Sequence, residues 1–274
     1  MVILTVKNIF KYFFILIFIF NQDNTYGQNK DAFRAGEWLK YKISYSGWFK
    51  AGEATVNLSH TNNQLHAKMI GKSTGPINLF FKVYDRYESY FDKEKHIPIK
   101  FIRDINEGGY TKNLEILFNH ELNEAKVNDF KRKSSKIFPI VQNSQDMVSV
   151  FYFLRNYYEL NTSEDNNDFT IDMFFDSENY KLKIRYLSTE IINTNFGKVL
   201  CYKIQPYVQS GRVFKKNESL TMWITADMNR IPIRIKADLI VGSVRVDLES
   251  FSNLNNPFET VSYTHLTLPT ILLV

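Results

Sequence analysis

Cysteine, glycine and proline are scarce in this sequence, and each scarcity excludes a class of protein. Among 274 residues there are one cysteine, eleven glycines and seven prolines. Because Cys201 has no second cysteine to join, no disulfide forms within the chain, and a folded state must depend on its core. The few glycines and prolines exclude a collagen-like chain, and 44% hydrophobic residues against 23% charged ones exclude a disordered chain. The composition is that of a globular protein.

Motifs of the common enzyme and metal-binding classes are not expected either. Dinucleotide-binding Gly-x-Gly-x-x-Gly segments and phosphate loops do not occur, and we predict no nucleophile elbow. The histidines His60, His66, His96 and His120 have neither helical i, i+4 spacing nor a nearby cysteine. His60 and His66 could lie on neighbouring strands and form a pair. We expect them instead to be ordinary exposed histidines on strands. We therefore predict no catalytic residue, no metal and no cofactor, and keep an unrecognised hydrolase or transferase as an alternative.

Several single residues could carry chemistry but have simpler explanations. Lone Cys201 lies between Leu200 and Tyr202 and is predicted to be a small buried hydrophobic residue. Carboxylates that could pair across strands as acid and base are Glu53, Asp85, Glu88 and Asp92. Solvated strand faces and ion pairs with Arg86 explain this set without catalysis.

The positive charge of the chain is mild. The formal net charge is +5, which bears on solubility and does not indicate nucleic acid as a partner. The one dense basic run, residues 131–136, has no interleaved aromatic residues and is predicted to be a solvated loop.

The N-terminus has the pattern of a secretory signal. Lys7 and Lys11 precede an apolar run, residues 12–20, that is too short to span a bilayer as a helix. We predict that residues 1–27 are a signal peptide cleaved between Gly27 and Gln28, with an uncleaved signal anchor as the alternative. Export to the periplasm or the outer membrane follows, without a transmembrane span after cleavage. The absence of a cysteine near the cleavage point argues against a lipoprotein signal.

The C-terminus is unusual. Residues 260–270 resemble one reading frame of the adapter used to prepare sequencing libraries. We therefore expect residues 260–274 to be a non-native tail that packs against nothing, and His265 drops out of every site argument. The alternative is a genuine threonine-rich strand.

Alternation of apolar and polar residues with period two dominates the rest of the chain and predicts strands. Twelve runs show it, at residues 39–45, 54–58, 65–69, 82–91, 97–103, 111–118, 168–175, 180–189, 199–208, 219–225, 231–237 and 243–251. Turn residues separate them, which predicts antiparallel meanders. The fold class is therefore mainly β.

One segment has helical period instead. We predict a central helix at about residues 144–159, capped by Asn143 or Ser144, with Asp146 in its first turn. Its predicted apolar stripe is Met147, Val150, Phe151, Leu154 and Tyr158. Its predicted solvent side is Ser149, Tyr152, Asn156 and Glu159. We expect the stripe to cover the apolar face of a sheet that includes residues 39–45 and 219–225.

An internal echo suggests two related meander units. The sequence Ile97-Pro98-Ile99-Lys100 is matched by Ile231-Pro232-Ile233-Arg234 after 134 residues, and each match precedes a further predicted strand. Proline suits a strand start, because it has no ladder donor to lose there. We predict one β-rich domain, residues 28–259, with halves at about 28–142 and 168–259 joined by the helix and a polar link.

Several segments together resemble an exported bacterial family called domain of unknown function 3108. They are Gly-Glu-Trp-Leu-Lys-Tyr at 36–41, Gly-Glu-Ala at 52–54, Asp-Arg-Tyr at 85–87, residues 146–155, and residues 223–232. The Gly-Gln cleavage edge and the usage of Asn, Lys and Ile also resemble those of Bacteroidetes proteins. The family's activity is unassigned, so the resemblance implies no catalytic residue.

A second resemblance implies a mechanism. Residues 223–227 and 231–233 with Gly242 are similar to the closing strands of periplasmic lipoprotein-localisation carriers. The similarity implies a curved antiparallel sheet or incomplete β-barrel, whose apolar concave face holds a lipid or other apolar ligand beneath a helix. The residues expected to line that ligand are Tyr41, Ile43, Val150, Phe151, Leu154 and Trp223. The alternative function is a structural or assembly partner of an envelope complex, which docks another protein by strand addition.

Overall fold

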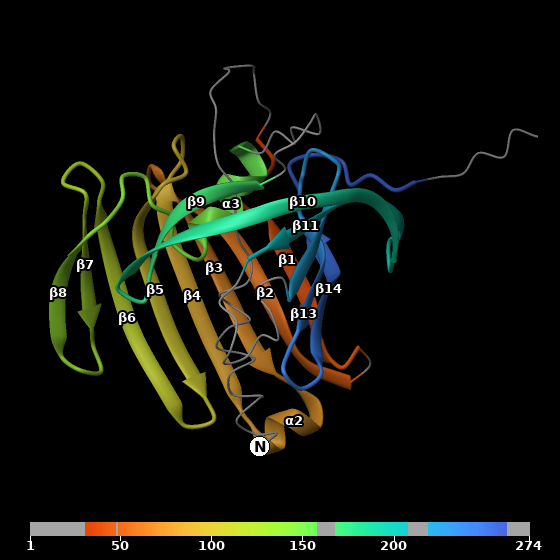
Figure 1. The fold of residues 1–274 in the computed structure, drawn as a ribbon, viewed down its shortest axis with the longest axis horizontal. Helices are drawn as coiled ribbons and strands as arrows, with labels where there is room; N and C mark the ends of the chain where they lie inside the picture. The colour runs from red at the N-terminus through yellow and green to blue at the C-terminus, as the bar shows by residue number, and fades with distance from the viewer. Residues whose placement is uncertain (1–30, 48, 158–167, 208–218, 262–274) are drawn as a thin grey trace, which may run out of the picture.

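The computed structural model describes residues 31–47, 49–157, 168–207 and 219–261 (Figure 1). The predicted signal peptide, its cleavage edge at Gly27 and Gln28, the polar link at 161–167 and residues 262–274 lie outside the described residues, so these predictions stay predictions. Within the described ranges, no helix combines the length and the apolar character needed to cross a membrane.

Among the described residues, fourteen antiparallel strands form one open sheet, in the order β8-β7-β6-β5-β4-β3-β2-β1-β14-β13-β12-β11-β10-β9. The first eight are β1 (Trp38–Tyr45), β2 (Phe49–Thr61), β3 (Gln64–Ser73), β4 (Val83–Asp92), β5 (Pro98–Glu107), β6 (Tyr110–Asn119), β7 (Glu124–Asp129) and β8 (Ser134–Pro139). The last six are β9 (Asp168–Phe175), β10 (Glu178–Thr194), β11 (Gly197–Pro206), β12 (Leu220–Thr225), β13 (Pro232–Asp238) and β14 (Ser243–Ser252).

The sheet consists of two meanders that meet in its middle. The first runs outward from β1 to β8, and the second runs inward from β9 to β14, which pairs with β1. The predicted mainly β fold with two halves is confirmed, as is the strand-start role of the echo, since Pro98 opens β5 and Pro232 opens β13. Figure 1 shows the sheet curling so that β9 and β10 pass over the helix α3.

Alternation gives the sheet a buried inner face, which is the face on which α3 packs. The register places inward side chains opposite one another across strands, as in the pairs Val56 with Met69 and Ile43 with Val246. Other buried members are Leu39, Ala67, Phe91, Phe101, Ile116, Val127, Ile184, Ile204, Met222 and Ile235. The outer face is polar, as where Lys40 lies between Glu53 and Glu249.

Strands β7 and β8 were not expected from the sequence. β7 directs only Ala125 and Val127 inward, which is too short an apolar pattern to stand out. β8 is an edge strand whose residues are nearly all exposed. The basic run at 131–136 therefore lies partly in the β7–β8 turn and partly in β8, which corrects the prediction of a loop throughout.

Helix α3 (Ser149–Tyr157) begins later than predicted, because its first turn is capped by Asp146. The Asp146 Oδ1 atom accepts the N–H groups of Val148 (2.6 Å) and Ser149 (2.8 Å). In return, the Asp146 N–H donates to Ser149 Oγ at 3.0 Å, which completes a capping box. The predicted caps Asn143 and Ser144 are wrong, since the Ser144 hydroxyl instead donates to the Val141 carbonyl at 2.6 Å.

The prediction of a solvent-exposed side on α3 is also wrong. Ser149 and Tyr152 are both 0% exposed, as buried as Val150 on the predicted stripe. The curled sheet explains this. Tyr152 stacks on Phe91 of β4 (ring centroids 5.4 Å apart), and the preceding segment pairs with β9 through Gln145 and Met173. The strand that α3 contacts most is therefore β4, and the predicted cover over β1 and β12 stays a prediction. Tyr158 and Glu159 lie outside the described residues.

Two smaller features were also not expected. A short helix, α2 (Gly75–Phe80), joins β3 to β4 and leaves Leu79 and Phe80 about four-fifths exposed. At the other end of the chain, the Val261 N–H donates to the Lys198 carbonyl at 2.7 Å. The expectation that the tail packs against nothing is therefore wrong at its start.

Candidate functional site

The inner face carries one group of charged side chains among its apolar ones, which we call the inner-face polar group. It arises because charged residues occupy inward positions of β4, β5 and β6, where alternation would otherwise place apolar side chains. Tyr87 lies directly opposite Arg103, and Glu107 lies opposite Val83 and Tyr110. The members are Asp85, Tyr87, Arg103, Glu107 and Lys112, with Asp176 from the β9–β10 turn.

Arg103 is the centre of this group and is 1% exposed. Its Nη1 atom donates to Asp176 Oδ1 at 2.5 Å, and Lys112 Nζ donates to the same oxygen. The guanidinium carbon lies 4.7 Å from the centre of the Phe175 ring and 6.0 Å from that of Tyr87. Within the described part of the chain, no acceptor meets Arg103 Nε or Nη2 with hydrogen-bond geometry, although the nearby Tyr87 hydroxyl interacts electrostatically with the guanidinium. A buried guanidinium normally has its donors paired, so these two N–H groups are exceptional.

The acidic members of the group are buried beside Arg103. Asp85 is 0% exposed, and its Oδ1 atom accepts the Asn106 N–H at 3.1 Å. Burial raises the pKa of Asp85 to about 6, although Glu107 and the charge of Arg103 act in the opposite direction. Burial also raises the pKa of Tyr87, so its hydroxyl stays neutral. The group thus combines a cation with a carboxyl that titrates near neutrality, a combination typical of ligand and catalytic sites.

Sequence reasoning misplaced Asp85. We expected it on a solvated strand face, but it follows Val83 and precedes Tyr87 at two-residue spacing, and both neighbours are buried. Arg103 repeats the pattern between Phe101 and Ile105. A polar residue inside a buried alternation was therefore the signal that could have revealed the group.

The other carboxylates of the predicted set have structural roles. Glu88 forms the expected ion pair with Arg86 at 2.7 Å. Glu53 pairs with Lys40 and Lys72 instead of Arg86. Asp92 accepts backbone N–H groups in the turn after β4.

The predicted ligand-lining residues divide between the two faces. Tyr41, Ile43, Val150 and Phe151 are buried, and Leu154 is half-buried. Trp223 is wrongly assigned, because Met222 and Ile224 take the buried positions of β12 and turn Trp223 outward. There its ring N–H donates to Glu190, and Lys203 Nζ lies 5.4 Å from the ring centre.

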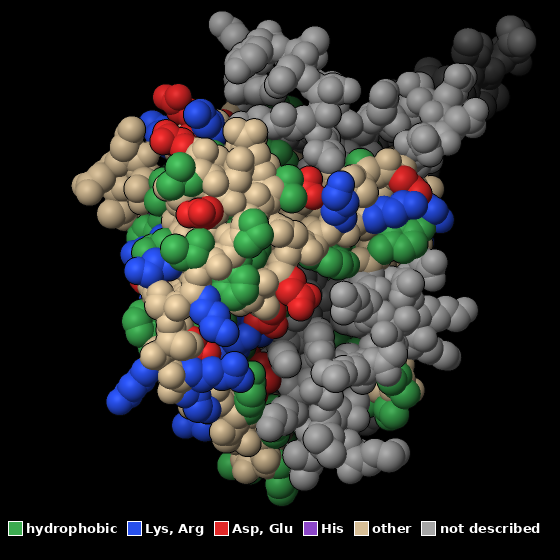
Figure 2. All heavy atoms as spheres, turned by 60° about the vertical axis from the view of Figure 1, so that its left-hand side comes forward, with side chains coloured by type: hydrophobic (Ala, Val, Ile, Leu, Met, Phe, Trp, Pro, Cys, Tyr) green, Lys and Arg blue, Asp and Glu red, His purple; other side chains and the backbone are tan. Residues whose placement is uncertain are grey.

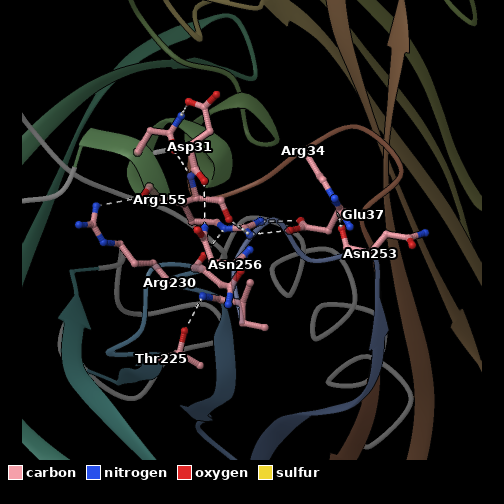
Figure 3. Close-up of polar contacts among 12 residues, drawn as sticks. Asp31, Arg34, Glu37, Arg155, Thr225, Arg230, Asn253 and Asn256 are labelled. Carbon is pink, nitrogen blue, oxygen red and sulfur yellow. Dashed lines mark hydrogen bonds and ion pairs between the residues drawn. The ribbon is translucent and has the colours of Figure 1, made fainter. Parts of the chain in front are cut away.

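A second buried polar cluster ties α3 to both ends of the described chain (Figure 3). Arg155 on α3 donates from Nη1 and Nη2 to the two carboxylate oxygens of Glu37, each at 2.6 Å. Its Nε donates to the Asn229 carbonyl at 2.9 Å, and Nη2 also donates to the Ala32 carbonyl at 3.1 Å. The Arg155 and Glu37 side chains are 2% and 0% exposed. All three nitrogens of this guanidinium thus donate within the protein, which indicates a structural clamp and not a ligand site.

The turn after β12 supports this clamp. Asp227 Oδ1 accepts the Thr225 hydroxyl at 2.7 Å and the Asn229 N–H at 2.9 Å. Arg230 follows in the same turn and donates from Nη1 to the Arg155 carbonyl at 3.1 Å. Figure 3 shows Arg155 surrounded by Glu37 of the N-terminal segment, Arg230 of this turn and Asn256 of the C-terminal segment.

Comparison with known proteins identifies the family. The model of the family described as "protein of unknown function (DUF3108)" matches residues 40–249. The chain belongs to this family. The match includes the whole inner-face polar group and Arg155, whereas Glu37 precedes it. No match to a curated protein is found.

Solved structures resemble this DUF3108 protein in fold. A β-barrel-like protein of the DUF1849 family from Brucella abortus aligns with a TM-score of 0.54 at 10% identity, covering 78% of this chain and 96% of that one. A Parabacteroides distasonis protein provisionally named a lipoprotein aligns with a TM-score of 0.37 at 12% identity, over 82% and 100% of the two chains. A Bacteroides fragilis protein with a YmcC-like fold, provisionally named an exported protein, aligns with a TM-score of 0.30 at 10% identity. The alignment covers 86% of this chain and 100% of that one. The first of these supports the β-barrel-like architecture.

On the outer face of this DUF3108 domain, a serine, a histidine and a carboxylate from three neighbouring strands lie next to one another. Ser59 Oγ lies 3.4 Å from His66 Nδ1, and His66 Nε2 lies 2.7 Å from Glu88 Oε2. His60 pairs with Leu65 and so projects to the opposite face from His66, which separates the two histidines. An acyl-transfer site also needs N–H donors for the oxyanion, and Ser59 lies within a paired strand whose N–H groups serve the ladder.

Sequence reasoning also missed a Gly-x-Ser-x-Gly spacing at residues 71–75. Ser73 ends β3 just before α2, which resembles the strand–turn–helix of a nucleophile elbow. Its hydroxyl donates to Asn78 Oδ1 at 2.8 Å and accepts the Val83 N–H at 2.9 Å. No histidine is among these partners, so the serine closes the β3–β4 connection structurally.

Metal and thiol chemistry find no support in the described ranges. No group of three or more metal-binding side chains occurs among those residues. Cys201 is 0% exposed, and burial raises the pKa of its thiol to about 12. The prediction that Cys201 is a small buried residue is confirmed.

Proposed function

We propose that this protein is an exported envelope protein that binds an apolar ligand such as a lipid on the inner face of its sheet. The observation that carries the proposal is the inner-face polar group. Burying several charged residues is costly, and a domain that only needed a filled core would gain stability from apolar residues there. A few buried polar groups inside an apolar surface are the arrangement expected of a ligand site.

The shape of the sheet supports the same proposal. Figure 1 shows α3 at one end of the curled sheet, whereas strands β2 to β6 and β13 and β14 extend well beyond it. Among the described residues, α3 is the one helix that packs on this face, since α2 joins the ends of β3 and β4 and buries none of its own residues. A long apolar face covered at one end suits an elongated apolar ligand.

The sequence supports export. The charged residues and the short apolar run before Gly27 form a secretory signal pattern, which supports export of the mature domain. The provisional names of the Parabacteroides and Bacteroides structures accord with an envelope location. The signal itself is tested by the mass of the protein recovered from the periplasm, which should begin at Gln28.

Assembly by strand addition is the second candidate, favoured by the open edge at β8. Ile137 on this strand is 62% exposed, and neighbouring Phe130 is 56% exposed. However, β8 also carries Lys136 and ends at Pro139, two features that protect edge strands from pairing. Figure 2 shows hydrophobic side chains on this side of the molecule in separate groups between Lys and Arg, not in one continuous patch.

The experiment that tests ligand binding is native mass spectrometry of protein purified from the periplasm, combined with organic extraction. We expect a co-purifying apolar molecule that is released on activation. After its removal, 1-decanol should bind to the stripped protein in a calorimetric titration. A bare protein mass, together with no binding of 1-decanol or of decanoic acid, would overturn the proposal and favour assembly.

A further inference from the structure

We propose that Arg103 binds the terminal oxyanion, carboxylate or phosphate, of an acyl ligand held on the inner face. The inference rests on the proposed function, because it assumes an apolar chain on that face and identifies what holds its polar end. The observation behind it is that Nε and Nη2, at a side chain 1% exposed, meet no acceptor with hydrogen-bond geometry within the described residues.

These two atoms form a matched pair of donors. The N–H bonds of Nε and Nη2 point the same way along one edge of the planar guanidinium, at the spacing of two oxygens of a carboxylate or phosphate. The remaining nitrogen is already used, since Nη1 donates to Asp176 at 2.5 Å. Asp176 therefore orients the guanidinium and leaves its side-on edge for another acceptor.

The same chain shows what this edge binds elsewhere. Arg185 donates from Nε to Asp168 Oδ1 at 2.8 Å and from Nη2 to Asp168 Oδ2 at 3.0 Å. That pair is accessible, because the Arg185 side chain is 43% exposed. The Arg103 edge differs in being buried, where an N–H···O bond to an ionised group is stronger than in water.

The surroundings of Arg103 suit a ligand with an apolar body. Phe101 and Ile105 flank it on the same face of β5, and Leu114 lies opposite on β6. The Phe175 ring lies 4.7 Å from the guanidinium carbon. An acyl chain would therefore continue along apolar side chains from an oxyanion bound at Arg103. Free inorganic phosphate lacks that chain and should bind far more weakly.

The test compares ligands that differ only at one end, on the protein stripped of lipid. Decanoic acid, decyl phosphate and 1-decanol are titrated by calorimetry into the wild-type protein at pH 8. We expect at least one of the two acids to bind about tenfold or more tightly than the alcohol, a difference of about 1.4 kcal/mol. Whichever acid gains more identifies the headgroup, fatty acid or phosphate ester.

Two variants complete the test. Arg103→Gln should lower the affinity for the preferred acid to that of 1-decanol and leave the alcohol unchanged. The matched control, Arg185→Gln, removes the same side-on edge from an exposed ion pair and should change neither affinity.

The two proposals fail differently. Equal binding of acids and alcohol by the wild type would overturn the role of Arg103 while the inner face still binds apolar ligands; internal pairing of Arg103 with Asp85 or Glu107 would give that result. An Arg103→Gln variant that folds and retains full preference for the acid would also overturn it. If that variant does not fold, the wild-type comparison alone decides. Failure of every ligand would instead overturn the proposed function.

Discussion

Removal of Arg155 is expected to destabilise the domain more than almost any other single change on α3. The Arg155→Met variant keeps the apolar stem but leaves Glu37, whose side chain is 0% exposed, without its partner. Breaking a buried ion pair from one side costs about 3–5 kcal/mol. The Ala32 and Asn229 carbonyls also lose their donor, which places the expected loss at the upper end of that range. The whole free energy of unfolding of a typical domain is only about 5–15 kcal/mol.

A double variant separates the cost of an orphaned charge from the value of the pair. Glu37→Leu with Arg155→Met removes both charges and replaces them with apolar side chains. Because the desolvation cost then disappears with the charges, the double variant should be more stable than Arg155→Met alone. Arg185→Met is the control, since its ion pair with Asp168 is partly exposed and should be worth at most about 1 kcal/mol.

The assay is urea unfolding followed by tryptophan fluorescence and by circular dichroism, at equal protein concentration. The slope of the transition must stay constant for the midpoints to be compared as free energies. An Arg155→Met loss below about 1 kcal/mol, or a double variant that loses the sum of the two single losses, would refute the reasoning, because either result means that Glu37 is not a buried charge in need of its partner.

Four further predictions use the same assay. Phe151→Ala should cost about 3–5 kcal/mol, because the ring is buried within α3 packing; a much smaller loss would mean that the helix does not pack there. Gly108→Ala should be destabilised, since its φ is +52° and a Cβ atom would meet the Phe81 ring at 2.2 Å; an unchanged midpoint would contradict that geometry. Burial raises the pKa of Asp146 from 3.8 to about 6, so the folded state holds its proton longer, and wild type should lose stability relative to Asp146→Asn as pH rises from about 4 to about 6. Burial lowers the pKa of His96 from 6.5 to about 4, so wild type should gain stability relative to His96→Asn over about pH 4 to 6.5; slopes of the opposite sign would refute both assignments.

The strands were predictable because a half-buried strand needs only its own alternation. β1 and β13 show this clearly, since Leu39, Tyr41 and Ile43, and later Ile233 and Ile235, fall on one face by period alone. β8 was not predictable, because an exposed edge strand has no apolar pattern to display. The buried sides of α3 were not predictable either. Periodicity finds one stripe on a helix, whereas Tyr152 is buried by two long-range contacts, with Phe91 of β4 and with Phe33 of the N-terminal segment.

The sequence could reveal which residues of the candidate site face inward, but not how they come together. Asp85 and Arg103 interrupt buried alternations, which marks them as inward-facing polar residues from the sequence alone. Their meeting depends on strand register, which sets Tyr87 opposite Arg103. The arrival of Asp176 depends on the curl that brings the β9–β10 turn back over β5 and β6. Long-range geometry of this kind is absent from local patterns.

The open sheet keeps its curvature without a closing ladder, and this gives Arg155 and Arg103 separable effects on ligand binding. In a closed barrel, strand number and stagger fix the diameter. Here β8 and β9 are opposite edges of the sheet, and α3 is tied to Glu37, just before β1, and to Asn229, between β12 and β13. Loosening that clamp alters the shape of the whole inner face, so a folded Arg155 variant should lose affinity for decanoic acid and 1-decanol by the same factor. Of the ligand, Arg103 is proposed to contact only the oxyanion, so its variant should change the affinity for the acid alone. Titrations in which Arg155→Met discriminated between acid and alcohol would show that the clamp, and not the inner-face polar group, recognises the headgroup.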